Sequence, residues 1–188
     1  MRDNSVLDKY SVIHITGAAG SGTTTLARAM ARKYGHTHLD TDDYFWEKTD
    51  PPFAMKREYA LRQKLLGEAI GSCEKCVISG SLTEWGDIFI PLFKLVIYVY
   101  TPTEVRLERL RKREFEWFGS RILPGGDMAA EQERFLLWAA EYDDGGMDIR
   151  SARHHAEWLK MGDCPVVRLD GMLPVEENMA ILEKVSMA

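Results

Sequence analysis

Long apolar runs are missing from this sequence. No stretch of its 188 residues approaches the roughly 18 apolar residues that a membrane-spanning helix needs. The first ten residues, MRDNSVLDKY, also lack the apolar centre of a secretory signal peptide. We therefore expect a cytoplasmic protein that does not bind membranes.

An excess of basic residues is missing too. The chain has 24 Lys and Arg against 29 Asp and Glu, which gives a formal net charge of −5. A general nucleic-acid binder needs surplus positive charge to neutralise phosphates. We therefore expect no nucleic-acid partner.

Cysteine is scarce, with three residues in the chain. Cys73 and Cys76 have the C-x-x-C spacing found in redox motifs and zinc sites. A zinc site needs a second pair of ligands, which Cys164 alone does not supply. We interpret the pair as ordinary thiols at a junction between a helix and a strand.

A lysine is absent where a phosphate-binding loop usually carries one. ITGAAGSGTTTLARAM (15–30) has the glycine spacing of such a loop, but Thr23 follows Gly22. The cradle is made of backbone N–H groups at a helix N-terminus, so it does not depend on the lysine. Thr24 occupies the position whose hydroxyl ligates Mg²⁺. The alternative is a turn that only links strand to helix. The predicted nucleotide-binding residues are Gly17, Ala18, Ala19, Gly20, Ser21, Gly22, Thr23, Thr24 and Thr25.

Short β-branched runs alternate with helical patterns, which is typical of βαβ units and a parallel sheet. Strands are predicted at 11–16, 37–40, 76–80, 94–100 and 165–170. Helices are predicted from the loop to Gly35, over 55–71, after 101 and from about Val175. The helix after 101 has a clear start signal, because Thr101 and Glu104 have capping-box spacing with Pro102 at the first helical position.

The stretch 119–150 breaks this alternation. It carries GSRILPGGDM and YDDGGMD around one helical segment, which is typical of a mobile cover over a phosphate site. We therefore predict a single domain, 1–188, with a lid insertion at about 119–150.

The loop and the order of elements around it resemble the small P-loop kinases, which include adenylate, shikimate and gluconate kinases. The run GAAGSGTTTLARAM…HLDTDDYFW…TDPPF more closely resembles a bacterial adenylate-kinase-like branch. The resemblance covers nearly the whole chain, although only the loop is highly specific. It implies a three-layer α/β P-loop NTPase fold, with a five-stranded parallel sheet in the order 2-3-1-4-5 and a helical lid.

HLDTDDYFW places two carboxylates at the carboxyl end of the second predicted strand, where open α/β sheets bind ligands. In shikimate-kinase-like proteins a D-x-D pair here lies beside the P-loop. The resemblance thus implies a metal role for Asp40 and an acceptor-binding or base role for Asp42. Two alternatives stay open: the carboxylates, with Asp43, cap the next turn, or His36, His38 and Asp40 share a strand face as a metal site.

Arg106, Arg109 and Arg113 fall on one face of the helix after 101. Small P-loop kinases carry arginines at the end of this helix and in the lid, where they close over the transferring phosphate. The resemblance therefore implies catalytic roles for Arg109, Arg113 and Arg121, because the guanidinium binds phosphate bidentately. The alternative is a solvated basic face that pairs with neighbouring glutamates.

Two further stretches concern the ligands. VISGSLTEWGD has small residues where adenylate kinases carry an Asp-Gly-Phe-Pro-Arg type segment, which argues against AMP as the acceptor. Asp170 follows the last predicted strand, in a loop that borders the adenine in the resembling kinases. The tryptophans are expected near the acceptor, where they either stack on a ring of the acceptor or pack within the core or the lid. They are Trp46, Trp85, Trp117 and Trp138.

These features predict a phosphotransferase that uses ATP, or another NTP, with Mg²⁺ to phosphorylate a small metabolite. A hydroxyl acceptor is favoured, because it must lose a proton and benefits from a nearby carboxylate. The alternatives are a nucleoside monophosphate kinase of the adenylate kinase type and a non-catalytic nucleotide sensor that lacks the loop lysine. The expected partners are a nucleotide and a small acceptor, and the chain is expected to be a monomer or homodimer.

Overall fold

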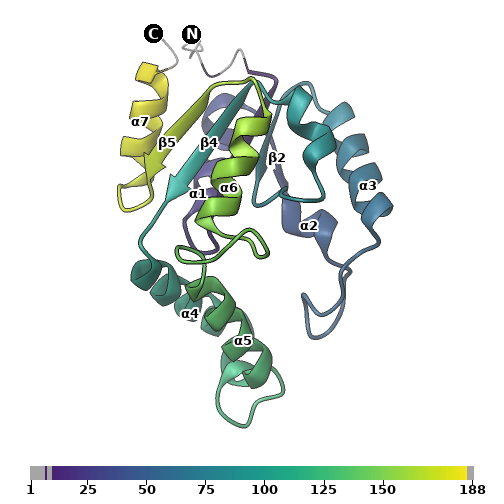
Figure 1. Cartoon of the computed structure of the whole chain (residues 1–188), viewed down its shortest axis with the longest axis vertical. Helices are drawn as coiled ribbons and strands as arrows, with labels where there is room; N and C mark the ends of the chain where they lie inside the picture. The colour runs from purple at the N-terminus through teal and green to yellow at the C-terminus, as the bar shows by residue number, and fades with distance from the viewer. Residues whose placement is uncertain (1–6, 8–9, 186–188) are drawn as a thin grey trace.

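A five-stranded sheet forms the centre of the computed structural model, which describes Leu7 and residues 10–185 (Figure 1). The strands are β1 (Val12–Gly17), β2 (Thr37–Asp40), β3 (Cys76–Ser79), β4 (Leu95–Tyr100) and β5 (Val166–Asp170). Every neighbouring pair is parallel, and the order is β2-β3-β1-β4-β5. The predicted fold class and sheet order are confirmed.

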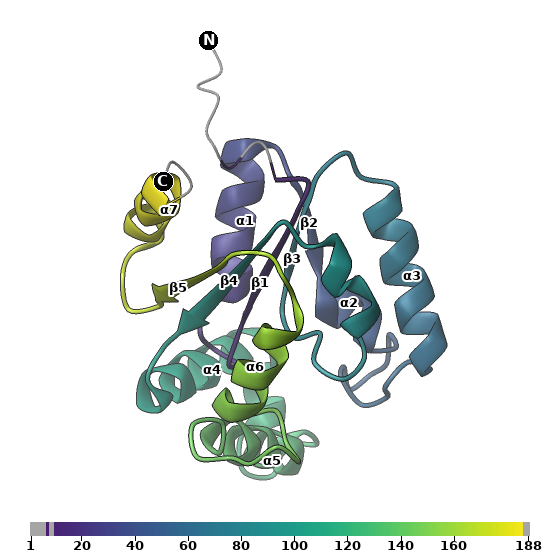
Figure 2. The same ribbon diagram turned by 45° about the horizontal axis from the view of Figure 1, so that its top comes forward.

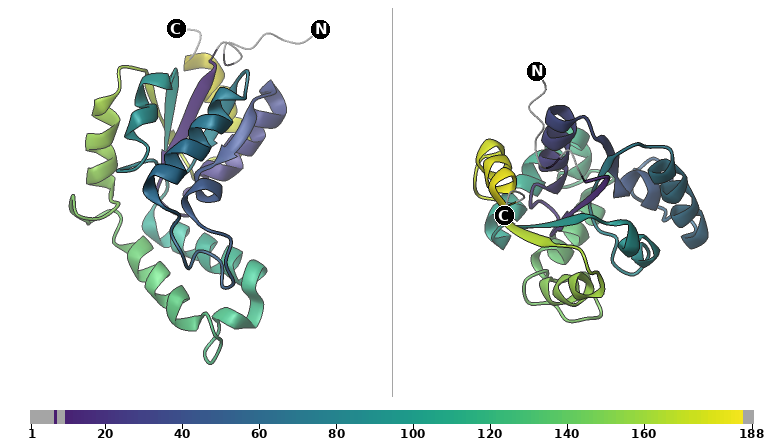
Figure 3. Two further views of the ribbon diagram at one scale, coloured as in Figure 1. Left: turned by 90° about the vertical axis from the view of Figure 1, so that its right-hand side faces the viewer. Right: turned by 90° about the horizontal axis from the view of Figure 1, so that it is seen from above.

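Helices cover both faces of the sheet and complete three layers (Figures 2 and 3). One face carries α1 (Thr23–Tyr34) and α7 (Val175–Val185), and the other carries α3 (Tyr59–Gly71), η2 (Asp87–Leu92) and α6 (Ala152–Trp158). A hairpin of α4 (Thr103–Phe118) and α5 (Ala129–Ala140) projects beyond the carboxyl ends of the strands (Figure 1). The short elements are α2 (Thr41–Phe45), η3 (Gly119–Ile122) and η4 (Leu159–Met161). Among the described residues, no helix combines the length and the apolar character needed to cross a membrane.

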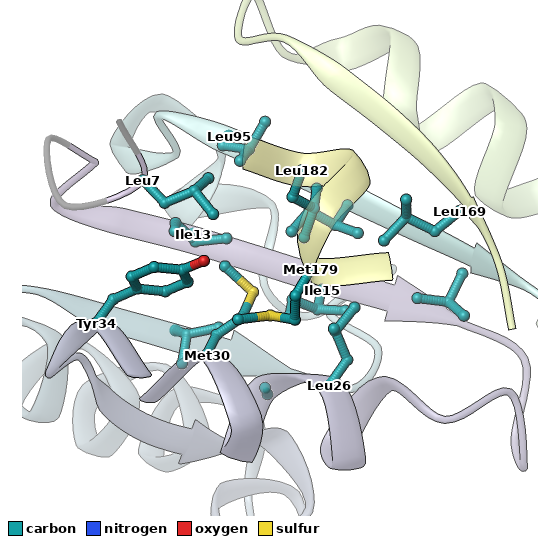
Figure 4. Close-up of a cluster of buried hydrophobic side chains, with 14 residues drawn as sticks. Leu7, Ile13, Ile15, Leu26, Met30, Tyr34, Leu95, Leu169, Met179 and Leu182 are labelled. Atoms are coloured by element: carbon teal, nitrogen blue, oxygen red, sulfur yellow. The ribbon is translucent and has the colours of Figure 1, made fainter. Parts of the chain in front are cut away.

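The side-chain alternation of β1 divides the core in two. Ile13 faces α1 and α7, where it packs in one cluster with Met30 and Leu182 (Figure 4). Val12 faces the opposite layer, in a second cluster that includes Leu66 of α3. Because the central strands are buried on both faces, their sequences read as continuous apolar runs.

Glycines in the left-handed region delimit α1. Gly22 is its N-cap with φ 102°, and Gly35 is its C-cap with φ 72° and donates its N–H to the Ala31 carbonyl. Glycine adopts this conformation without the steric penalty of a Cβ atom. The helix therefore begins at the last glycine of the loop, with its first N–H groups at the carboxyl end of β1.

Three expectations about the helices were wrong. Thr101 does not cap α4: the N-cap is Pro102, and the Thr101 hydroxyl donates to the Ser21 carbonyl at 3.1 Å. α3 begins at Tyr59 rather than at 55, because Lys56 forms an isolated antiparallel bridge with Trp46. α6 has no counterpart in the sequence-based prediction.

The cysteines behave as ordinary thiols. All three are free, and Cys76 is buried in β3. Burial raises the pKa of the Cys76 thiol to about 12, so this thiol is protonated and unreactive at neutral pH. The interpretation of the pair as ordinary thiols at a junction between a helix and a strand stays a prediction.

Candidate active site

The glycine-rich loop between β1 and α1 presents an electropositive helix end. Gly20 and Gly22 both have positive φ, and a Cβ added at Gly22 would meet only open space. No side chain caps the helix at Gly22, and its first turn carries no acidic residue. The first N–H groups of α1 thus remain available to an anion, which the helix dipole also favours.

The loop is braced from behind. A Cβ at Gly20 would lie 2.8 Å from the Arg106 carbonyl, so only glycine lets the loop approach α4 so closely. The hydrogen bond from Thr101 fixes the Ser21 carbonyl to the end of β4. These contacts tie the loop to α4 and to the end of β4.

Thr24 and Asp40 lie side by side in front of this loop. The Thr24 hydroxyl donates to one Asp40 carboxylate oxygen at 3.3 Å, and the other oxygen accepts the Asp42 N–H at 3.2 Å. Ser79, at the end of β3, extends the cluster through His38 Nε2, which lies 2.8 Å from its hydroxyl. Asp40 therefore caps α2, as the turn alternative predicts. Its carboxylate also faces Thr24, the other predicted magnesium ligand.

The alternative metal site of His36, His38 and Asp40 is not formed. His36 Nε2 lies 3.0 Å from the Tyr10 carbonyl, while His38 contacts Ser79. In the part of the chain that the structure describes, no group of three or more His, Cys, Asp or Glu could hold a metal ion. A cation here would depend on oxygen ligands from Thr24, Asp40 and a bound phosphate.

Asp42 follows in the first turn of α2. Loss of hydration, and then repulsion from the Asp40 carboxylate, raise the pKa of Asp42 above its ordinary value of 3.8. The guanidinium groups of Arg150 and Arg113 oppose this increase. A carboxylate with a raised pKa is suited to accept a proton from a bound hydroxyl.

The arginines of α4 occupy different environments. Arg106 is fully buried, donates to the Thr101 and Ala139 carbonyls, and contacts the Asp143 carboxylate at 3.3 Å. The three arginines predicted to share one face of α4 therefore do not have a common environment. Arg106 links α4 to the end of α5 through these contacts. Arg109 is exposed and donates to the Gly171 carbonyl at 3.0 Å.

The two other predicted arginines are held by carboxylates. Arg113 donates to Glu114 at 2.5 Å, and its guanidinium lies over the Trp117 ring. Arg121, in η3, pairs with Asp127 at 2.7 Å and with Asp50 at 2.8 Å. Arg121 thus joins the segment after α4 to the loop between α2 and α3.

Asp170 is the last residue of β5 and precedes the turn that leads to α7. Its carboxylate accepts the Met172 N–H at 2.8 Å, so the side chain shapes its own turn. The following N–H, of Gly171, donates to the Tyr100 carbonyl at 2.6 Å. These contacts keep the turn beside the phosphate-binding loop, at the same edge of the sheet.

The four tryptophans do not gather at one place, contrary to expectation. Trp46 and Trp85 both pack edge-on against Phe45, with ring centroids 4.9 and 5.9 Å away. Trp117 is 56% exposed on α4, and Trp138 lies on α5. Trp46 and Trp85 thus lie beside the D-x-D segment, because Phe45 belongs to α2, whereas Trp117 and Trp138 pack on the guanidinium groups of Arg113 and Arg150.

Sequence reasoning missed Arg150, which lies against the loop. Its Nη2 donates to the Gly17 carbonyl at 2.6 Å, and the guanidinium lies 5.7 Å from the centre of the Trp138 ring. No local motif marks this arginine, since its partner is 133 residues away in the sequence. Only the folded chain reveals it as a cation of the site.

A buried polar network behind Arg150 was missed as well. His155 Nδ1 lies 2.6 Å from the Tyr142 hydroxyl, and His155 Nε2 lies 3.3 Å from the Ser81 hydroxyl. Burial lowers the pKa of His155 well below its ordinary value, so the imidazole is neutral. The network ties α6 and the end of α5 to the turn after β3, and so fixes the segment that carries Arg150.

Comparison with known proteins agrees with this geometry. The AAA domain family matches residues 13–116. The "Uncharacterized protein YqaC" of Bacillus subtilis is 42% identical over 166 residues, covering 88% of this chain and 92% of that protein. A cytidylate kinase of Thermococcus sibiricus is 31% identical over 116 residues, covering 56% of this chain and 58% of its own length.

A solved structure matches almost the whole fold. A shikimate kinase from Acinetobacter baumannii, in complex with shikimate, superposes with a TM-score of 0.56 and covers 95% of this chain and 94% of its own. The identity is 19%, so this similarity shows the shared fold alone. The α/β P-loop kinase architecture is therefore established independently of the motifs.

Proposed function

The chain belongs to the AAA domain family and to the P-loop superfamily of nucleotide and small-molecule kinases, and from this premise we propose that it transfers the γ-phosphoryl group of ATP to a hydroxyl of a small metabolite. The observation that carries the proposal is the position of Asp40 and Asp42 beside the phosphate-binding loop. Asp40 contacts Thr24, and the Asp42 carboxyl has a raised pKa. A phosphate cradle next to a proton acceptor is the minimum that this reaction needs.

Residues 17–25 would hold the triphosphate through the N–H groups at the start of α1. The loop after β5, with Asp170 and Gly171, would border the base, since it lies against the same end of β4. ATP and another NTP are both compatible with these contacts, which are made by backbone groups.

A magnesium ion fits the donor set in front of the loop. Thr24 and Asp40 provide hard oxygen ligands, which Mg²⁺ prefers, and their oxygens are already 3.3 Å apart. Together with phosphate oxygens and water they would hold the ion, which would screen the negative charge of the triphosphate. The proton transfer and the closure of the lid would depend on side chains of the protein itself.

Asp42 would act as the general base. It would accept the proton of the acceptor hydroxyl while that oxygen bonds to the γ-phosphorus and the bond from phosphorus to the β,γ-bridging oxygen breaks. ADP then leaves with the bridging oxygen, and the proton stays on the carboxyl until it passes to solvent. The raised pKa favours this role, because it makes the Asp42 carboxylate a stronger base than an ordinary aspartate.

The segment 119–150 would act as a lid over the nucleotide. It follows α4 and carries Arg121, while α4 carries Arg109 and Arg113 at the same end of the molecule (Figure 1). Their present partners, a carbonyl and carboxylates, are groups from which a phosphate could take them over.

Two other functions have specific support. The similarity to a cytidylate kinase favours a nucleoside or nucleotide acceptor. Thr23 favours a sensor that binds nucleotide without turnover, because the usual lysine is missing.

A coupled assay of ADP formation with Mg-ATP distinguishes the three functions. The acceptors tested would be sugar acids, polyols, nucleosides and nucleoside monophosphates, with ATP binding measured by calorimetry. We expect ADP formation with one class of hydroxyl compound. Turnover with nucleoside monophosphates alone would support the nucleotide kinase, and ATP binding without turnover on any acceptor would support the sensor.

A further inference from the structure

The phosphate-binding loop lacks the positive charge of its usual lysine. Thr23 stands at that position, and its side chain is uncharged. Backbone N–H groups supply only partial charges, whereas the β- and γ-phosphates carry most of the charge of ATP. If the protein binds and transfers phosphate, another cation has to reach the loop.

The arginines of α4 and η3 are engaged elsewhere. Arg113 and Arg121 are each paired with a carboxylate, and Arg109 is held at the Gly171 carbonyl. Arg106 is buried behind the loop with Asp143 as its ion-pair partner. Of these four guanidinium groups, that of Arg106 also reaches the loop, where it donates to the Ala19 carbonyl at 3.4 Å from the side of α4.

Arg150 differs from these four arginines by a combination of features. It contacts the loop at Gly17, and it forms no ion pair within 4.0 Å among the described residues. Its Nε atom is buried with no hydrogen-bond partner in the same part of the chain. A guanidinium with a buried, unused donor is costly to keep, and an anion between it and the loop would satisfy both its charge and its donor.

The surroundings of Arg150 orient it toward the loop. The Trp138 ring lies on one side, 5.7 Å from the guanidinium carbon. The contacts of His155 with Tyr142 and Ser81 fix the chain before and after Arg150. Asp42 is the carboxylate whose attraction acts on this guanidinium, while Arg106 repels it.

We propose that Arg150 replaces the missing lysine and binds the terminal phosphates of the nucleotide from the side opposite the N-terminus of α1. The proposal rests on the proposed function and specifies which residue makes the lysine-free loop competent. On ATP binding the guanidinium keeps its contact at Gly17 or exchanges it for a phosphate oxygen. The fork geometry of arginine lets it serve both partners at once.

Calorimetric titration with ATP, ADP and AMP, each with Mg²⁺, tests this assignment. We expect Arg150→Ala and Arg150→Gln to weaken ATP binding by about tenfold or more. ADP binding should weaken less, and AMP binding should hardly change, because the lost charge acts on the terminal phosphates. Arg150→Gln keeps a donor for Gly17 and guards against a purely structural effect. The matched control is Arg153→Ala, which removes an exposed arginine three residues away and should leave all three affinities unchanged.

A second arm moves the charge back into the loop. Thr23→Lys should restore most of the ATP affinity in the Arg150→Ala background and add much less to the wild-type chain. Such non-additivity shows that both side chains serve the same phosphates. Additive effects would overturn the proposal, as would an equal loss of affinity for ATP and AMP. If the wild-type chain itself does not bind ATP, the proposed function fails first, and the two failures are thus distinguishable.

Discussion

At the residue scale, Gly22 is the most direct test of the phosphate cradle. A side chain there would project into the open space in front of α1, where the phosphates would lie. We expect Gly22→Val to abolish ATP binding in calorimetry while unfolding stays cooperative.

Gly35→Val is the matched control. Gly35 is also left-handed, with φ 72°, and a Cβ there would meet only the flexible end of Lys75. Both variants strain one end of α1, but only the first obstructs the loop. ATP binding that survives Gly22→Val, or that is lost equally in both variants, would remove the loop from the site.

Asp42→Asn separates chemistry from binding. If Asp42 is the base, turnover should fall by about two to four orders of magnitude, with ATP affinity nearly unchanged. Asp43→Asn, one residue later and also exposed, is the matched control and should retain turnover. Equal and small effects of both changes would leave the D-x-D segment with its capping role alone.

The same variant has a stability consequence with a definite sign. The native pKa of Asp42 is raised above 3.8, so the folded chain binds this proton more tightly than the unfolded chain. The stability linked to that proton is fully present below the ordinary pKa and is lost as the pH rises through the raised one. Asp42→Asn should therefore raise Tm at pH 8, and the gain should shrink toward pH 4. A gain that grows on acidification would contradict the raised pKa.

A site residue could be predicted from the sequence only where the residues that define its position lie within one short segment. The loop and Asp40 were recognisable because each depends on residues within one short segment. Arg150 was not, since its position against Gly17 is created only when the chain folds. The roles of Arg109, Arg113 and Arg121 stay predictions.

At the element scale, the sheet was predictable and the helix ends were not. The strand β4 matches its predicted range to within one residue because a strand buried on both faces leaves a continuous apolar run, here LVIYVY. The start of α4 was misassigned because Thr101 and Glu104 have the right local spacing. The folded chain uses the Thr101 hydroxyl for the Ser21 carbonyl instead, a contact 80 residues away.

The ion pairs of Arg121 connect two elements that would cover the site. Exposed pairs contribute little to global stability, so Arg121→Ala should lower Tm by about 2 °C or less. Limited proteolysis should nevertheless cleave faster within 119–128, because the segment loses both Asp50 and Asp127. Arg134→Ala, which breaks an exposed pair inside α5, should leave the cleavage rate unchanged. Equal cleavage of both variants would mean that Arg121 does not hold the segment.

At the scale of the whole molecule, the parallel sheet is what assembles the site. The carboxyl ends of β1, β2 and β5 deliver Gly17, Asp40 and Asp170 to one edge, and the segment after α5 returns Arg150 to the same place. In the proposed function, residues far apart in the sequence would therefore bind one ligand, which should couple ligand binding to global stability.

Mg-ATP should accordingly stabilise the whole chain against heat. A ligand at one hundred times its Kd adds about 2.7 kcal/mol, which for a chain of this size corresponds to a Tm increase of roughly 5–10 °C. We expect EDTA to reduce that increase, because in the proposed function Thr24 and Asp40 would hold a cation that screens the phosphates. Thr24→Ala should remove most of the difference in Tm increase between Mg-ATP and metal-free ATP. Thr37→Ala, which removes an exposed hydroxyl at the other end of β2, is the matched control and should preserve that difference. A Tm increase that is equal with and without the metal in the wild-type chain would exclude this pair as the cation site.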